Sequence, residues 1–538
     1  MKKKIIILDR WLDMRLNYYY NFKNTIRFFM DIENMDFSKV QQNKKSWSVP
    51  FKFRIKKDDS SFRTLQIPNI YNFKLAYDYY KTEFVNIGYD FENLEALDTH
   101  KRMKISYELG EFKENSYDDW QLIDYDMLID YDLLIRCDIK AFYDNIYTHY
   151  IFNDVTTNKE IDKPLSHMNN GRTGGIIMGN YISLYVAEVL SRKISSRFSD
   201  RISELGLKCN FSYFSDDFYI FTCNESKNVI INLFDEVLEE FNLEKNEAKV
   251  QFFDYLKYTN EDIIEKYWKI ITRKSKEQQY NQGIKIAQGK LEYNNNLFFT
   301  NQLIYRLNKI DDYKKRRVFI VNFFKSEFFR SIDFSKTYFA EYNYHQLLYL
   351  IKEFPEIVLY INSILDAFDE LKSIDFVDKI IGFYKRSLCS NYHDEQLYFF
   401  YLLHKLNAID KIKCEKLNKK VLETKNYILI SYYISNNLFY IDEINTIKGY
   451  DKENYWLVYY YLILKDEALY ADLENSIVRY LIPKSATGDV INAYKEFYFE
   501  NLNAKNDILV SIDKISSKID EYFKEKYLKE TSDESEVS

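Results

Sequence analysis

The chain has 538 residues, with 75 Lys and Arg against 82 Asp and Glu, which gives a net charge of −7. This acidic balance argues against a protein that coats nucleic acid without discrimination. The length suggests roughly two to four domains, and the 46% of apolar residues suffices for large cores. No apolar run approaches the ~18 residues that cross a bilayer, so no membrane partner is expected.

The N-terminal segment and the cysteines indicate the cellular compartment of the protein. The apolar stretch in Met1–Arg10 ends after four residues, which is too short for the core of a signal peptide. The five cysteines are odd in number and lack metal-site spacing. Both observations predict a cytoplasmic protein with reduced thiols.

The first predicted element is a β-hairpin with alternating basic residues. Lys52–Lys57 and Phe62–Pro68 flank a short acidic turn. Arg54, Lys56 and Arg63 would then project toward one ligand, and such cations suit a triphosphate. The alternative is a solvated edge strand whose lysines discourage aggregation.

The next element is an apolar strand that ends in an acid. Leu133–Cys137 leads into Asp138, and Phe142 and Tyr143 follow four and five residues later. Tyr143 is expected under the sugar of an incoming nucleotide, where its bulk would exclude a 2′-hydroxyl. The alternatives are a helix N-cap for Asp138 and core packing for the two aromatic residues.

A glycine turn then leads into a helix. Gly174–Ser183 precedes the helical pattern of residues 184–198. Glycines before a helix let the backbone approach a phosphate, sugar or base closely, which makes Gly175, Gly179 and Asn180 candidate nucleotide contacts.

The most informative element is a second hairpin with two adjacent acids at its tip. Asn210–Phe214 and Phe218–Cys223 are strand-like and flank the tip. Asp216 and Asp217 would repel each other unless a cation neutralises them. Mg²⁺, with Mn²⁺ as the alternative ion, would bind these two acids and Asp138 as a two-metal phosphoryl-transfer site. The alternative is an ordinary Asp-Asp turn.

The second half of the chain is helical. Residues 1–265 mix short strands, turns and helices, whereas residues 266–530 show apolar residues at helical spacing and predict a helical-repeat domain. Residues 531–538 form an acidic tail that is expected to be disordered. The basic run Lys314–Arg317 is expected either to contact a nucleic-acid backbone or to be a solvated helix face. The predicted fold class is therefore α+β.

The order of these elements resembles the fingers and palm of a reverse transcriptase, over about residues 50–255. The resemblance puts Arg63 and its hairpin in the fingers, and it distributes the palm motifs over Asp138, Gly175–Ser183, Phe214–Asp217 and Leu243–Lys249. It implies catalysis and metal binding by Asp138, Asp216 and Asp217, and it places Lys249 or Lys245 near the leaving phosphate.

Three departures from that pattern indicate which group of reverse transcriptases the chain resembles most. Phe214 replaces the usual Tyr, Ile177 and Met178 stand where many reverse transcriptases have Pro and Gln, and no thumb pattern follows the palm. With these features the chain resembles the AbiK-like abortive-infection group of bacterial reverse transcriptases, which defend against phage.

The resemblance to that group implies several further properties. It implies a helical C-terminal domain in place of a thumb, homo-oligomers, and DNA synthesis from dNTPs that is either RNA-directed or template-independent. It also implies protein priming in some members, with single-stranded DNA attached to a tyrosine. An RNA or a phage component is a further expected partner.

Rival interpretations concern both halves. Arg386 and His393, expected two turns apart on one helix face, resemble the Arg-x-His signature of HEPN ribonucleases, although Ser387 departs from it. A catalytically silent palm-fold scaffold is a second alternative, and a palm-fold nucleotide cyclase is a third.

Overall fold

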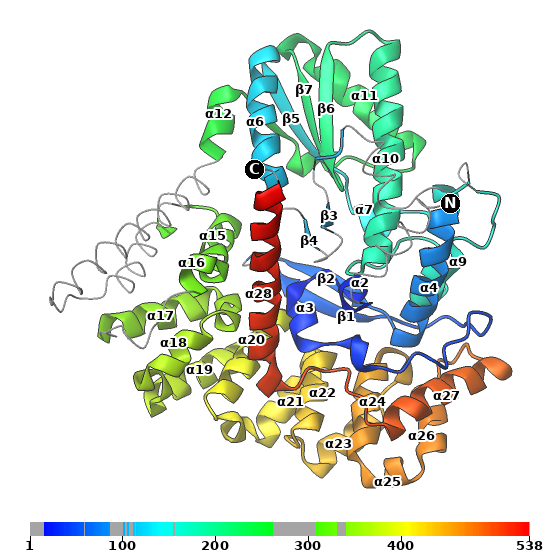
Figure 1. The fold of residues 1–538 in the computed structure, drawn as a ribbon, viewed down its shortest axis with the longest axis vertical. Coiled ribbons are helices and arrows are strands. Elements are labelled where there is room, and N and C mark those ends of the chain that lie inside the picture. The colour runs from blue at the N-terminus through cyan, green and yellow to red at the C-terminus, as the bar shows by residue number, and fades with distance from the viewer. Residues whose placement is uncertain are drawn as a thin grey trace. The chain divides into compact units, whose positions relative to one another are not determined.

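A computed structural model describes residues 16–58, 60–86, 100–102, 105–106, 111–112, 115–153, 156–261, 307–308, 310–330 and 341–536. The fold is mixed and mostly helical, with small β-sheets (Figure 1). Within the described ranges, no helix is long and apolar enough to span a membrane. The N-terminal Met1–Arg10 segment lies outside the described residues.

The chain divides into two compact units that are each discontinuous. The first unit comprises residues 1–52, 65–260 and 451–508, and the second comprises residues 53–64, 261–450 and 509–538. Each of the two units contains segments from both halves of the sequence. The predicted division into two domains at residue 265 therefore stays a prediction.

The elements of the first unit, apart from the hairpin strands described below, are listed by chain position. They are α2 (Leu16–Tyr20), α3 (Asn24–Phe29), α4 (Ile70–Asn86), β3 (Ile105–Ser106), β4 (Glu111–Phe112), α6 (Asn115–Asp130), β5 (Leu133–Asp138), α7 (Phe142–Asn145), α8 (Thr148–Ile151), α9 (Lys163–Met168), α10 (Tyr181–Glu204), β6 (Cys209–Phe214), β7 (Asp217–Thr222), α11 (Lys227–Glu240), β8 (Gln251–Phe253), α12 (Tyr255–Glu261), α24 (Trp456–Lys465), α25 (Glu467–Ala471), α26 (Leu473–Tyr480) and α27 (Asp489–Asn503).

Four strands of this unit form one antiparallel sheet in the order β6-β7-β5-β8. Helix α10 lies in the connection from β5 to β6, and α11 lies in the connection from β7 to β8. This β-α-β-β-α-β order is the split βαβ arrangement of ferredoxin-like sheets. The strands predicted at residues 133–138 and on both sides of Asp216 are therefore confirmed.

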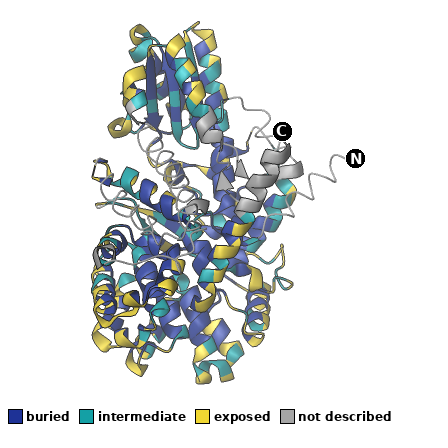
Figure 2. Cartoon of the chain, turned by 60° about the vertical axis from the view of Figure 1, so that its left-hand side comes forward, coloured by how far each residue is buried: buried dark blue, intermediate teal, exposed yellow. Residues whose placement is uncertain are grey.

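Both faces of the sheet are covered. Phe198 of α10 contacts Phe211 of β6 and Phe234 of α11, with ring centroids 4.9 and 5.3 Å apart. On the other face, Leu128 of α6 and Tyr258 of α12 share a buried cluster with strand residues. Figure 2 shows the strands largely in the colour of buried residues. The core therefore fixes the strand ends on which the site is built.

The C-terminal helices of the first unit pack on its N-terminal part. The rings of Tyr71 in α4 and Tyr494 in α27 stack with centroids 4.0 Å apart. Asn69 donates from Nδ2 to the hydroxyl of Tyr498 at 2.7 Å, and the Tyr494 hydroxyl donates to Asn72 at 2.8 Å. Residues that are more than 400 positions apart in sequence thus form one core.

The second unit is helical. Its helices are α15 (Tyr313–Lys325), α16 (Glu327–Arg330), α17 (Glu341–Glu353), α18 (Asn362–Ala367), α19 (Ile374–Ser387), α20 (His393–Lys405), α21 (Glu415–Thr424), α22 (Tyr427–Ser435), α23 (Ile441–Lys448) and α28 (Ile512–Glu536). The hairpin of β1 (Phe51–Lys56) and β2 (Phe62–Ile67) is confirmed as a two-stranded sheet, and its tip belongs to this unit.

Helix α28 differs from the predicted disordered tail, because it continues to Glu536. Its first turns are fixed by buried Ile515, Ile519 and Phe523. Once a helix is nucleated, each further residue adds a hydrogen bond at low cost, and Lys- and Glu-rich sequence favours that extension.

Candidate functional site

Three carboxylates are brought together at one end of the two central strands. Asp138 is the last residue of β5 and lies directly opposite Asp217, the first residue of β7. Asp216 occupies the two-residue turn between β6 and β7, and its carbonyl accepts a hydrogen bond from the backbone N–H of Ile139 at 3.0 Å. The predicted grouping of a strand-end acid with the acidic hairpin is thus present in the fold.

The turn that carries Asp216 is strained and supported from α10. Ser215 has a φ of +55°, a left-handed conformation that non-glycine residues adopt at a cost. The buried hydroxyl of Ser191 lies 2.9 Å from the carbonyl oxygen of Ser215 and 3.0 Å from that of Ala187, either of which accepts its proton. Helix α10 therefore positions the acidic turn as well as covering the sheet.

Asp138 is buried, and both of its carboxylate oxygens have partners. Asn246 donates from Nδ2 to Oδ1 at 3.0 Å, and its backbone N–H donates to the Asp138 carbonyl at 2.7 Å. The ammonium of Lys249 forms an ion pair with Oδ2. Lys245, the other lysine predicted here, instead pairs with Asp235 at 2.7 Å and with Glu247 at 3.1 Å.

The electrostatics of the site favour a cation. Burial, together with the charges of Asp216 and Asp138, raises the pKa of Asp217 to about 6. Lys249 and Arg136 oppose that rise. Clustered carboxylates of this kind fit a hard divalent ion such as Mg²⁺, which takes oxygen ligands. A metal ion at Asp138, Asp216 and Asp217 stays a prediction, because within the described residues their oxygens are not among the groups of three ligand atoms that lie within 4.8 Å of one another.

The aromatic pair after Asp138 is buried. Phe142 and Tyr143 lie in α7 with exposed fractions of 2% and 8%. The carbonyl of Tyr143 accepts a hydrogen bond from Ile176 at 2.9 Å. The first glycine turn thus packs directly on the segment that follows Asp138.

Two glycines of the turn fill tight positions. At Gly175, with a φ of +80°, an added Cβ would lie 3.0 Å from the carbonyl oxygen of Asp144. At Gly179, with a φ of +132°, it would lie 3.1 Å from Nδ2 of Asn21. Asn180 is fully buried and caps α10 by accepting a hydrogen bond from Ser183 N–H at 2.9 Å. These contacts are intramolecular, and the nucleotide-binding roles of Gly175, Gly179 and Asn180 stay predictions.

Two cations of the basic hairpin contact other side chains of the second unit. The ammonium of Lys56 lies 3.1 Å from Glu395, and Arg54 donates to the side chain of Asn391 at 3.0 Å. Burial lowers the pKa of Lys56, but Glu395 and Tyr313 outweigh it and raise the net value above the ordinary one. Arg63 is exposed. Two of the three predicted triphosphate ligands therefore already have protein partners.

The prediction that Arg386 and His393 lie on one face of the same helix is wrong. Arg386 lies near the end of α19, whereas His393 begins α20 after a break. The break arises because serine side chains compete for the backbone. Ser390 donates to the Ser387 carbonyl at 2.8 Å, and its oxygen accepts from Tyr392 N–H at 3.2 Å.

His393 is a buried structural residue. Its exposed fraction is 2%, Nδ1 accepts from the N–H of Arg54 at 3.3 Å, and Nε2 lies 3.1 Å from the carbonyl of Thr424. Burial, reinforced by the charge of Arg54, lowers the pKa of His393 to about 3.

The basic run Lys314–Arg317 lies at the start of α15. Lys314 is exposed, whereas Arg317 pairs with Glu356 at 2.9 Å and with Asp394 at 3.7 Å. At least one of the four cations is therefore used inside the second unit.

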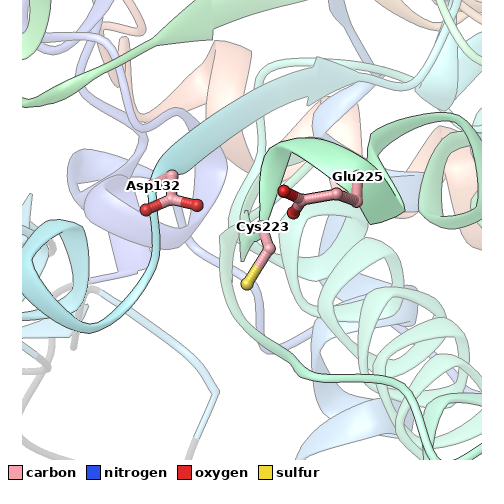
Figure 3. Close-up of side chains that lie close together, drawn as sticks. All are labelled: Asp132, Cys223 and Glu225. Carbon is pink, nitrogen blue, oxygen red and sulfur yellow. The ribbon is translucent and has the colours of Figure 1, made fainter.

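A separate group of side chains, of the types that can bind a metal ion, lies at the opposite end of the β5–β7 pair. Asp132 precedes β5 and Cys223 follows β7, and their ligand atoms lie within 4.8 Å of each other and of Glu225 (Figure 3). In the described part of the chain it is the one set of three such residues that meets this distance. The two acids are exposed, so the group is compatible with a solvated surface.

Two supporting residues carry no distinctive sequence signal. Asn246 sits between the predicted lysines Lys245 and Lys249, so proximity to that motif could have suggested it. Ser191 lies in the middle of a helix pattern, where serine ordinarily bonds to the preceding turn. Only the folded contact between α10 and the β6–β7 turn reveals its second acceptor.

No protein-family model and no curated protein matches the chain. Among solved structures, the chain is similar to apo telomerase from Candida tropicalis truncated from its C-terminal domain. The identity is 15% and the TM-score 0.29, over 38% of this chain and 50% of that one.

A second solved structure is telomerase from Candida albicans in complex with the TWJ fragment of telomeric RNA. The identity is 10% and the TM-score 0.30, over 77% of this chain and 66% of that one. The chain thus spans half and about two thirds of those proteins. Both TM-scores are low.

Proposed function

We propose that the chain is a reverse-transcriptase-like DNA polymerase that transfers nucleotides from dNTPs with the help of Mg²⁺ or Mn²⁺. The observation that carries this proposal is the register of Asp138 against Asp217, with Asp216 in the adjoining turn of a split βαβ sheet. That arrangement places three carboxylates on two neighbouring strand ends, where they can share metal ions.

The residues of the site then have distinct roles. Asp138, Asp216 and Asp217 would hold the metal, which stabilises the charge on the attacking and leaving oxygens when bound. Asn246 keeps the carboxylate of Asp138 in place. The ammonium of Lys249 is held beside the carboxylates, where it supplies positive charge for a phosphate.

Further features of the proposal come from the sequence resemblance. Ile177 and Met178 at the glycine turn favour synthesis that does not depend on a template. The resemblance also supports a protein-primed product, homo-oligomers and a role in abortive infection against phage. Tyr143 would select deoxynucleotides, and Arg63 would contact the triphosphate.

The ribonuclease alternative is disfavoured by the geometry of the second unit. General acid-base catalysis needs a histidine within reach of substrate. His393 is buried and both of its ring nitrogens are engaged. The incorporation experiment distinguishes a polymerase from a catalytically silent scaffold.

The test is incorporation of single labelled dNTPs with Mg²⁺ or Mn²⁺, in the presence and absence of a primer-template. Wild-type protein should form labelled product, and Asp216→Asn should reduce it by at least a hundredfold. Asp132→Asn is the matched control, because this exposed acid lies at the other end of the same strand pair. Absence of product under every condition, with Asp216→Asn protecting cells from phage as well as wild type does, would sink the polymerase proposal.

A further inference from the structure

Three exposed aromatic rings lie around one short loop of the first unit. Trp47, Tyr147 and Tyr150 have exposed fractions of 51%, 42% and 61%. The rings of Tyr147 and Tyr150 contact each other, with centroids 4.9 Å apart. Large rings are seldom left this open together on a surface that has no partner.

The backbone of loop 171–174 connects these rings. Gly174 forms an antiparallel bridge with Tyr147. At Gly171, with a φ of +72°, an added Cβ would lie 3.3 Å from the indole of Trp47, so the indole packs against bare backbone. The three residue steps from Gly171 to Gly174 reach at most ~11 Å, which is about three stacked bases at ~3.4 Å each.

The charges beside the rings complement a polyanion. Arg172 in this loop and Lys45, two residues before Trp47, are exposed and have no ion-pair partner among the described residues. The buried carboxylate of Asp162 contacts Nδ1 of His149. Two exposed acids oppose these cations: Asp144 of α7, and Glu160, whose pKa is lowered first by its hydrogen bond to Lys163 and also by the charge of Lys45.

We infer that Trp47, Tyr147 and Tyr150 form a stacking platform for single-stranded nucleic acid, with Arg172 and Lys45 contacting its phosphates. Exposed rings with interspersed cations bind unpaired bases because every base offers a ring face. The inference rests on the proposed function, since it names the surface that would carry the strand. Tyr147 and Tyr150 follow Asp138 by nine and twelve residues in sequence, and loop 171–174 leads into Gly175.

The experiment measures binding without catalysis. Fluorescence anisotropy of labelled oligo(dT) and oligo(rU) is recorded in EDTA and without dNTPs, so that failure of the polymerase proposal leaves the readout intact. Tyr147→Ala/Tyr150→Ala should weaken binding about tenfold or more, given the size of base-ring stacking. Tyr147→Phe/Tyr150→Phe keeps both rings and should bind like wild type. Comparison of the two oligonucleotides tells whether the strand is DNA or RNA.

Matched controls separate the platform from general effects. Tyr255→Ala removes a 44% exposed ring on α12 of the same unit and should leave binding unchanged. Arg172→Gln should lower the slope of log Kd against log salt by about 0.7, as expected for one lost phosphate contact to a single strand. Arg479→Gln, an exposed arginine on α26, should not change that slope. The inference is overturned if wild type binds neither oligonucleotide, or if the Ala and Phe pairs bind alike.

Discussion

The two neighbouring residues His393 and Asp394 should give the second unit opposite responses to pH. Burial lowers the pKa of His393 to about 3, and it raises the pKa of Asp394 to about 7 against the opposing charge of Arg317. In the folded protein, histidine therefore resists protonation while aspartate resists ionisation. Asp394→Asn and His393→Gln each remove one of these two titrations.

The magnitude follows from proton linkage. Between pH 4.5 and 6.5 the unfolded chain binds a proton on His393 that the folded protein does not, so stability rises with pH. For Asp394 the folded protein holds the extra proton, so stability falls with pH. At 1.36 kcal/mol per pH unit, each effect amounts to about 2 kcal/mol over this interval, and in wild type the two cancel.

The assay is urea unfolding followed by circular dichroism at pH 4.5, 5.5 and 6.5. Relative to wild type, Asp394→Asn should gain about 2 kcal/mol across the interval, and His393→Gln should lose about as much. Asp378→Asn, an exposed acid on α19, serves as the control. If both variants keep the pH dependence of wild type, the assigned burial effects are wrong.

Three further outcomes follow from the first unit. In thermal melts, Gly175→Ala should lower the free energy of unfolding by about 1–3 kcal/mol, because its Cβ meets a backbone carbonyl at a positive φ. Gly174→Ala has open space at its Cβ and should leave the free energy of unfolding nearly unchanged. Asn246→Ala should reduce dNTP incorporation more than tenfold and also weaken Mn²⁺ binding measured by electron paramagnetic resonance, since it frees the Asp138 carboxylate; unchanged Mn²⁺ affinity would contradict that role. Ser191→Ala should cost about 1 kcal/mol of stability and slow incorporation by loosening the β6–β7 turn; Ser191→Thr, which keeps the hydroxyl, should recover part of both.

Local features of the sequence were sufficient to predict the strands that carry the carboxylates. An apolar run that ends in Asp138, and two aromatic runs on either side of Asp216, have the period and length of strands. The pairing of Asp138 with Asp217 then follows from the fold. The same pattern predicted two candidate lysines, Lys245 and Lys249, and only the structure shows that Lys249 is the one that pairs with Asp138.

Contacts between distant segments could not be predicted in this way. An apolar stripe shows that a helix face is buried, but it does not tell what covers it. The stacking of Tyr71 on Tyr494 and the pairing of Lys56 with Glu395 join residues hundreds of positions apart. The alternation of cations on β1 therefore predicts a nucleotide ligand, and it does not reveal that Lys56 pairs with Glu395 of α20.

The discontinuous first unit has a consequence for the timing of synthesis. Residues 451–508 complete its core, so a growing chain that has passed residue 260 still lacks Tyr494 and Tyr498. At ~5–20 residues per second, the ribosome needs tens of seconds to supply them. During that time the strands that carry the carboxylates have been made, but the residues that pack on α4 have not. A translation product that stops before residue 498 would thus lack a complete first unit, although it contains every carboxylate of the candidate site.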